Sequence, residues 1–219
     1  MTVGERYREL VDEIVTVAGN CGRDPNEIKL VAVTKGCPLE HVLPAYEAGA
    51  KIFGENRVQE ALSKIDQAPN EIDWHLIGSL QKNKVRKAVG RFSLIHSVDS
   101  VDLARKISEV SVEQGVVSPI LLQVNTSGEE TKHGLTPFEL TEAWPSLLPL
   151  KGIDIQGLMT MAPFVDDPQL IRECFRKLRL LRDRHGLKHL SMGMSHDWQL
   201  AIEEGATLLR VGTAIFQTD

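Results

Sequence analysis

The sequence predicts a single (β/α)8 barrel of the TIM type with an extra N-terminal helix, and three observations support this fold class. Short apolar or β-branched runs alternate with segments whose apolar residues recur at three- and four-residue spacing, as strands and amphipathic helices do. Eight such runs occur, and glycine or proline marks most boundaries between them and the helical segments. The 219 residues suffice for one such barrel and are too few for two ordinary domains. We therefore expect one domain over residues 1–219.

The expected strands are mostly apolar, as strands buried on both faces are. They are residues 28–35, 50–55, 72–78, 93–98, 119–125, 154–160, 189–193 and 208–216. Strands that alternate with helices pair in parallel through right-handed crossovers, and eight such units favour closure into a barrel. The alternative is an open doubly wound sheet, but the dinucleotide fingerprint GxGxxG that often accompanies it is absent.

Proline and glycine mark the expected ends of the helices. Prolines stand near helix starts and glycines just past helix ends: Pro38, Pro137 and Pro168, then Gly49, Gly115, Gly186 and Gly205. A helical stretch at about residues 5–20 precedes the first strand, whereas almost nothing follows the eighth. We expect this leading helix to cover the seam that a final helix would otherwise close.

The composition is that of a globular cytoplasmic protein. Hydrophobic residues make up 42% and charged residues 25% of a chain with net charge −5, so no basic field attracts nucleic acid or an anionic membrane. The three cysteines, Cys21, Cys37 and Cys174, form no CxxC metal pair or disulfide framework, which fits a reducing compartment. The charged N-terminus lacks the apolar core of a signal peptide. We therefore expect no metal, nucleic-acid or membrane partner.

Polar and small residues gather at the carboxyl ends of the expected strands, where barrels of this type place their active sites. Lys35 ends the first strand. Partial desolvation there would lower its pKa and free the amine to condense with an aldehyde. A lone strand-end lysine more often extends its ammonium group to solvent, so Lys35 needs support from elsewhere in the chain.

That support comes from the last two strands, whose loops often bind phosphate in barrels. Ser195 follows strand seven and is expected to cap the next helix, offering a hydroxyl and free N–H groups. Gly212 and Thr213 follow strand eight, where the glycine lets the backbone approach an anion. A simple cap at Ser195 and a simple turn at Gly212 remain alternatives. Arg210 lies in a nearly apolar strand. If its side chain faces into the barrel, it needs a partner such as a ring nitrogen, because an unpaired buried charge is costly. If it faces outward, it would pair with a carboxylate on a helix.

These segments resemble the pyridoxal 5'-phosphate (PLP) homeostasis proteins known as the YggS or PROSC family. The matching stretches are VAVTK (31–35), FGENRVQE (53–60), WHLIGSLQKNK (74–84), HSVDS (96–100), VNTSGEETKHG (124–134), GLMTMAP (157–163) and LSMGMSHDWQLAIEEGATLLRVGTAIF (190–216). They span nearly the whole chain in order. The resemblance implies a barrel of the type found in the N-terminal domain of bacterial alanine racemases.

The resemblance assigns roles to residues at the barrel mouth. Lys35 would hold PLP as a Schiff base, Ser195, Gly212 and Thr213 would bind its phosphate, and Arg210 would face the pyridine nitrogen. Asn56 would contact the ring or its hydroxyl. Met159 would lie near the ring, although a place in the barrel wall is the alternative. His75 is expected only to line the pocket or pack, and Cys37 receives no role.

The assigned residues favour a PLP carrier over an enzyme. An arginine cannot accept the pyridine proton, so it weakens the ring as an electron sink and disfavours transamination. Racemisation needs a second acid/base group, which the racemases take from a further β domain that we expect this chain to lack. We therefore expect PLP homeostasis that influences amino-acid and keto-acid balance, delivery to PLP-dependent apoenzymes, and a monomer. The alternatives are a weak amino-acid racemase and a barrel whose Lys35 forms a Schiff base directly with a substrate.

Overall fold

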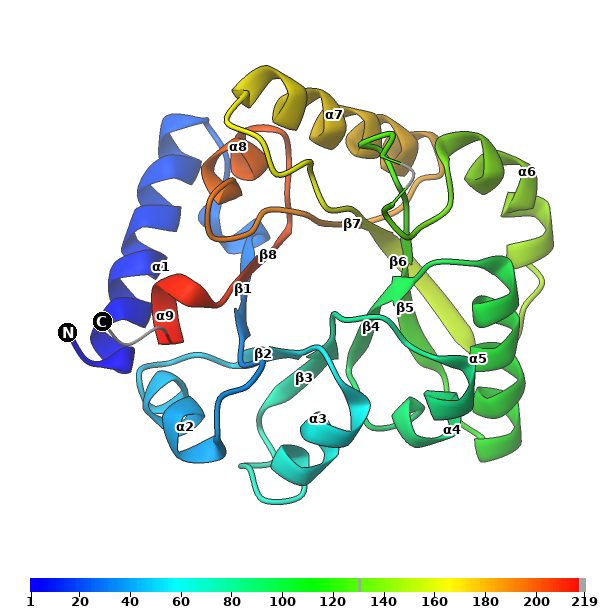
Figure 1. The fold of residues 1–219 in the computed structure, drawn as a ribbon, viewed down its shortest axis with the longest axis horizontal. Helices are drawn as coiled ribbons and strands as arrows, with labels where there is room; N and C mark the ends of the chain where they lie inside the picture. The colour runs from blue at the N-terminus through cyan, green and yellow to red at the C-terminus, as the bar shows by residue number, and fades with distance from the viewer. Residues whose placement is uncertain (130, 217–219) are drawn as a thin grey trace.

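The computed structural model describes residues 1–129 and 131–216, and its strands form a closed parallel barrel in the order β1 to β8 (Figure 1). The strands are β1 (Lys29–Val33), β2 (Ile52–Glu55), β3 (Asp73–Leu76), β4 (Leu94–Val98), β5 (Ser118–Gln123), β6 (Ile153–Met159), β7 (His189–Ser191) and β8 (Leu208–Val211). Barrel closure is direct, because β1 pairs with β8 through four register positions from Lys29 with Leu208 to Ala32 with Val211. The expected (β/α)8 fold is confirmed.

Helices surround the barrel on its outside (Figure 1). They are α1 (Val3–Asn20), α2 (Leu39–Glu47), α3 (Val58–Ile65), α4 (Val85–Ala88), α5 (Val101–Gln114), α6 (Pro137–Leu147), α7 (Pro168–Arg184), α8 (Trp198–Glu203) and α9 (Thr213–Phe216), with short 3₁₀ helices at Pro25–Glu27 and Lys82–Lys84. The helix boundaries follow the expected signals. Pro137 and Pro168 open α6 and α7, and the glycines just past α2, α5, α7 and α8 all have positive φ angles, which glycine adopts without strain.

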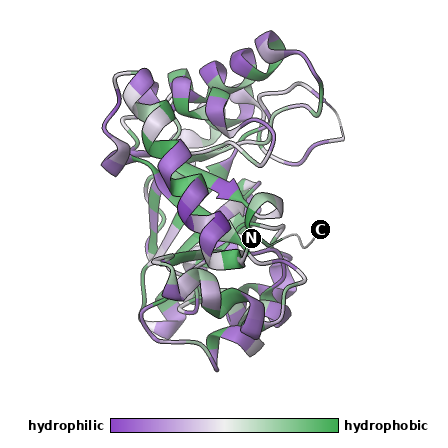
Figure 2. Cartoon of the chain, turned by 90° about the vertical axis from the view of Figure 1, so that its left-hand side faces the viewer, coloured by the Kyte–Doolittle hydropathy of each residue, from purple (hydrophilic) through white to green (hydrophobic). Residues whose placement is uncertain are grey.

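The leading helix α1 covers the seam between the first and last strands, as expected. It starts with a capping box in which Thr2 and Glu5 bond each other's backbone N–H groups. It packs against α2, α8 and α9 (Figure 1). Hydrophilic and hydrophobic residues alternate along it in the view of Figure 2, and Leu10 and Ile14 lie on its buried face. Arg6 Nε donates to the carbonyl of Ile215 at 2.8 Å and so joins the two ends of the fold.

The last expected strand, 208–216, is too long and needs correction. β8 ends at Val211, and residues 213–216 form the short helix α9. The backbone turns at Gly212, whose carbonyl accepts from the N–H groups of Ile215 and Phe216 at 2.9 Å each. The apolar run LLRVGTAIF therefore contains a strand and a helix, which apolar content alone does not separate.

Successive side chains along each strand point alternately into the barrel and toward the helices, so the core has two parts. One apolar cluster fills the barrel interior: Val31, Leu94, Leu121, Met159 and Leu208. The larger cluster lies between the strands and the surrounding helices and includes Phe53, Ile95, Leu122 and Leu209. Because these side chains pack inside the barrel, its interior is a packed core and not a pore.

Among the described residues, no helix combines the length and apolar character needed to cross a membrane.

Candidate functional site

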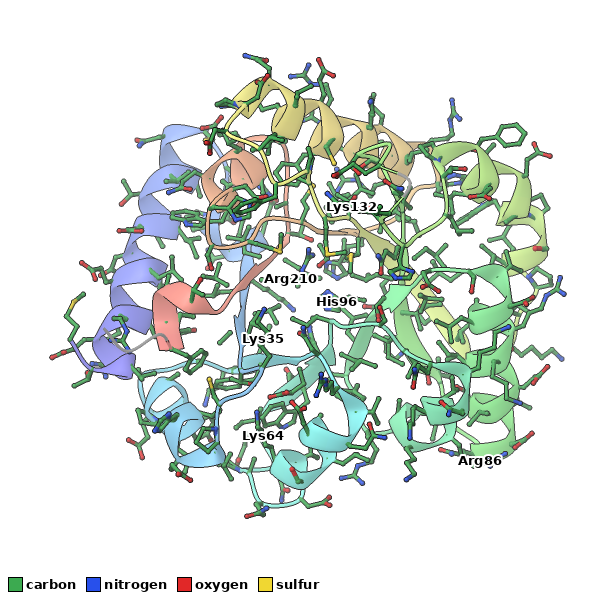
Figure 3. The ribbon with its side chains drawn as sticks, in the orientation of Figure 1. Lys35, Lys64, Arg86, His96, Lys132 and Arg210 are labelled. Atoms are coloured by element: carbon green, nitrogen blue, oxygen red, sulfur yellow. The ribbon has the colours of Figure 1, made fainter. Side chains whose placement is uncertain are left out.

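Lys35 lies in a tight turn two residues after β1, at the carboxyl end of the barrel. Gly36 has a φ of 71°, and the N–H of Cys37 donates to the carbonyl of Thr34 at 3.1 Å to close the turn. The strand ends at Val33, earlier than expected, and Lys35 is exposed. The expected partial desolvation of its amine is therefore not found in this structure. Figure 3 shows Lys35 at the barrel mouth, near Arg210.

The structure brings Lys35 together with the end of β8. Lys35, Gly212 and Thr213 line one hollow of about 190 Å³, together with Val33, Cys37 and Phe216. The neighbourhood follows from barrel closure, because β1 and β8 pair directly. An added Cβ at Gly212 would lie only 2.9 Å from the carbonyl oxygen of Val33. Glycine therefore allows the backbone after β8 to run against the strand that carries Lys35.

Two hydroxyl groups meet beside this hollow. Thr213 Oγ1 donates to Ser195 Oγ at 2.5 Å, so the loops after β7 and β8 place their hydroxyls together as the sequence suggested. The expectation that Ser195 caps a helix is wrong, because α8 begins only at Trp198 and Asp197 is the residue before it. Asp197 Oδ1 instead accepts from the N–H of Met194 at 2.5 Å, which forms a turn ahead of the helix.

Arg210 points into the barrel and is buried, so the outward-facing alternative is excluded. Its guanidinium Nη1 donates to Ser191 Oγ at 2.5 Å, and Nη2 donates to the carbonyl of Thr160 at 2.9 Å. Burial lowers the pKa of Arg210 to about 10, and the Asp197 carboxylate opposes that shift. The guanidinium thus remains charged at neutral pH and serves as a donor beneath the mouth.

Asn56 and Met159 occupy the ends of β2 and β6. Asn56 directly follows β2 and is half-buried. Gly78 comes so close to it that an added Cβ at Gly78 would lie 2.3 Å from the Asn56 carbonyl oxygen. Met159 is 1% exposed within the interior apolar cluster, a position in the barrel wall. Contacts of Asn56 and Met159 with a cofactor remain predictions.

A buried ion pair that the sequence reasoning did not identify lies behind the Lys35 turn. Lys64 Nζ donates to the Thr34 carbonyl at 2.8 Å and to Glu55 Oε1 at 2.5 Å, and the Thr34 hydroxyl also donates to Glu55. Burial raises the pKa of Glu55, while its hydrogen bonds with Lys64 and Thr34 oppose the shift. Lys64 thereby fixes the residue that immediately precedes Lys35. The signal in the sequence was a lysine on the apolar face of the 58–65 helical segment.

Comparisons with known proteins identify the family of this chain. A family model described as the alanine racemase N-terminal domain matches residues 19–219. A pyridoxal phosphate homeostasis protein of Aquifex aeolicus is 42% identical over 99% of this chain and 98% of that protein. The structure of PipY from Synechococcus elongatus with PLP bound has a TM-score of 0.84 at 38% identity, covering 99% of this chain and 100% of that chain.

More distant structures share the fold alone. An alanine racemase of Corynebacterium glutamicum has a TM-score of 0.76 at 17% identity, and the match covers 99% of this chain but 61% of the racemase. The full-length similarity lies with the homeostasis proteins. This chain therefore belongs to the pyridoxal phosphate homeostasis protein family and is built on the N-terminal domain fold of the alanine racemases.

Proposed function

We propose that this protein binds PLP through a Schiff base at Lys35 and acts in PLP homeostasis as a carrier. The observation that carries the proposal is the meeting of Lys35, Gly212 and Thr213 in one hollow, in a family with a PLP-bound member. A carrier of this kind holds a reactive aldehyde, keeps its free concentration low and influences amino-acid and keto-acid balance.

The residues at the mouth suit the three parts of PLP. Lys35 supplies an amine for the aldehyde. The paired hydroxyls of Ser195 and Thr213 and the close backbone at Gly212 suit a phosphate, since hydroxyls and uncovered N–H groups bind anions. Arg210 supplies a charged donor that suits the unprotonated nitrogen of a pyridine ring. Asn56 and Met159 complete the proposed contacts.

Bound PLP supplies an electron sink for reactions at an amino-acid carbon, and this chain's residues determine how strong that sink is. Arg210 can donate a hydrogen bond but cannot accept a proton, so a ring nitrogen beside it stays unprotonated and the sink stays weak. Lys35 condenses through its neutral amine: a C=N bond forms with the aldehyde carbon and water leaves. These properties favour reversible capture over efficient racemisation.

Three further features belong to this proposal. We infer that the protein acts in the cytoplasm, because none of its three cysteines is paired. PLP-dependent apoenzymes are the proposed recipients, since they consume the captured aldehyde. A monomer is the proposed state, because each residue assigned to the site lies in a single chain.

Borohydride reduction followed by peptide mass spectrometry tests the attachment site. The wild-type protein incubated with PLP should show a visible absorption band that borohydride abolishes, with the adduct on the peptide that contains Lys35. Lys35→Ala should lose both signals. Lys188→Ala, at an exposed lysine beside the start of β7, is the matched control and should keep them. An adduct that persists at full yield in Lys35→Ala would overturn the assignment.

Amino-acid turnover separates a carrier from a racemase. We expect alanine racemisation far below the rate of about 1 s⁻¹ at the low end of ordinary enzymes. Turnover at or above that rate would replace the carrier by a PLP enzyme. A borohydride-trapped adduct formed with a carbonyl substrate in the absence of PLP would instead indicate an aldolase-like use of Lys35.

A further inference from the structure

Four polar side chains form one hydrogen-bonded chain inside the otherwise apolar barrel. Arg210 Nη1 donates to Ser191 Oγ at 2.5 Å, Ser191 Oγ lies 2.8 Å from His96 Nδ1, and His96 Nε2 lies 2.9 Å from His75 Nδ1. The residues come from β8, β7, β4 and β3, and Figure 3 shows Arg210 and His96 close together near the barrel axis. All four side chains are buried.

The direction of every hydrogen bond in this chain follows from Arg210. A guanidinium only donates, so Ser191 Oγ is the acceptor in the first bond. The Ser191 hydroxyl then has His96 Nδ1 as its acceptor among the described residues. His96 accordingly carries its proton on Nε2 and donates it to His75 Nδ1. One arrangement of protons satisfies the whole chain.

The two histidines remain uncharged, so Arg210 carries the only charge among these four hydrogen-bonded residues. Burial lowers the pKa of His75 to about 3, with smaller contributions from Lys29 and His189. Burial also places the pKa of His96 well below its usual value, and the neighbouring His75 and Arg210 add to this effect. A neutral His96 keeps Nδ1 free to accept from Ser191 over the physiological pH range.

We propose that Ser191, His96 and His75 are positioning residues that orient Arg210 toward the pyridine nitrogen of PLP. The inference rests on the proposed function. The Ser191 hydroxyl becomes a better acceptor when its own proton is donated onward to His96. Together with the Thr160 carbonyl on Nη2, it holds the guanidinium in one orientation beneath the mouth. His75 contributes indirectly, by accepting the His96 proton and so fixing the form in which His96 accepts.

The proposed positioning of Arg210 goes beyond supplying hydrogen-bond partners to buried polar groups. If these hydrogen bonds only satisfied buried polar groups, then removing one of the residues would lower stability and leave the chemistry of bound PLP unchanged. If these residues position Arg210, then removing one of them deprives the ring nitrogen of its hydrogen-bond donor and allows that nitrogen to be protonated. The protonation of that nitrogen is therefore the measurement that distinguishes the two roles.

The experiment uses nitrogen-15 NMR of labelled PLP bound to the protein between pH 6 and 9, together with the rate of PLP release. In the wild type, we expect an unprotonated ring nitrogen throughout this range. In Ser191→Ala and His96→Leu, we expect the nitrogen to titrate within it, with PLP released about threefold faster or more, as the loss of one hydrogen bond allows. His96→Asn, whose amide oxygen can accept from the Ser191 hydroxyl, should restore much of the wild-type behaviour.

A matched control separates positioning from stability. Ser111 is a buried serine whose Oγ lies 2.8 Å from Ser118 Oγ, away from the barrel mouth. Ser111→Ala should lower the melting temperature without altering the ring nitrogen. A wild-type nitrogen signal in both Ser191→Ala and His96→Leu, or an equal change in Ser111→Ala, overturns the inference. If the wild-type protein forms no visible band with PLP, then the proposed function itself fails, which is a separate and recognisable result.

Discussion

Gly212 occupies a position at which a side chain has no space. Its Cβ would lie 2.9 Å from the Val33 carbonyl oxygen and 3.1 Å from the Val33 Cβ. We expect Gly212→Ala to lower the free energy of unfolding by about 1–3 kcal/mol, a cost common for overpacking, and to weaken PLP binding beside Lys35. Urea unfolding and a PLP titration measure the two effects.

Gly19→Ala provides the control for this prediction. Gly19 lies within α1, and an added Cβ there meets nothing within 4 Å. Alanine should stabilise that helix by up to about 1 kcal/mol, because it removes conformational freedom from the unfolded chain. Equal destabilisation by both substitutions would contradict the steric account of Gly212.

The pair formed by Lys64 and Glu55 makes a second residue-scale prediction. Lys64→Met leaves Glu55 buried without its cation, so we expect a loss of about 3–5 kcal/mol in unfolding free energy at pH 7. Burial already raises the pKa of Glu55, and losing Lys64 raises it further. A buried carboxyl with a raised pKa destabilises the fold as pH rises, because the unfolded state ionises first. The defect should therefore shrink between pH 7 and pH 5 in urea titrations.

The double variant Lys64→Met with Glu55→Gln tests the cause. It removes the buried charge, so it should recover part of the lost stability and lose the pH dependence. A Lys64→Met defect that is constant with pH would show that packing, and not the Glu55 charge, accounts for the loss.

At the scale of elements, α1 acts as the closing helix of the barrel. Leu10 on its buried face is 5% exposed, whereas Val15 on the same helix is 46% exposed. We expect Leu10→Ala to cost about 2–5 kcal/mol and Val15→Ala well under about 1 kcal/mol. Hydrogen exchange should show the loss of protection at β1 and β8 before β4. Uniform loss across the barrel would mean that α1 stabilises the whole fold and not the seam.

Elements whose sequence carries a local signal were predictable. The eight strands follow from apolar runs bounded by turns, and the meeting of Lys35 with Gly212 follows because closure makes the first and last strands neighbours. The cap at Ser195 was wrong because serine and aspartate are both favourable caps, and only the fold shows that Asp197 forms a turn with Met194 first.

The polar chain in the barrel could not be predicted from the sequence. Arg210, Ser191 and His96 lie on three strands, and their contacts depend on the register between strands and on the shear of the closed barrel. A sequence shows that each of these residues alternates with apolar neighbours, but it does not show at which level along the barrel axis each side chain lies. For the same reason His75 was expected only to line the pocket or pack, and its hydrogen bond with His96 was not anticipated.

At the scale of the whole molecule, the two buried histidines predict how stability depends on pH. Burial lowers the pKa of His75 to about 3 and that of His96 well below its usual value. The unfolded state binds protons near pH 6.5 that the folded state does not bind. Stability therefore falls as pH drops below that value, by about 1.4 kcal/mol per pH unit for each such histidine.

Urea unfolding between pH 7 and pH 4.5 measures this slope. Replacing His75 by Phe should flatten it, whereas replacing the exposed His41 by the same residue should leave it unchanged. A slope that is identical in the wild type and the His75→Phe variant would assign acid sensitivity to other groups.

The seam covered by α1 also sets an order of events during synthesis. Residues 3–20, which form α1, are translated before any strand of the barrel, yet α1 packs against α8 and α9. Arg6 Nε on this helix also donates to the carbonyl of Ile215. The part of α1 that packs against α8 and α9 therefore stays uncovered until those helices have been translated, although α2 is available earlier. A nascent chain halted before residue 208 should thus expose Leu10 and Ile14 to proteases and chaperones, and the addition of residues 208–216 should complete the barrel in one cooperative step.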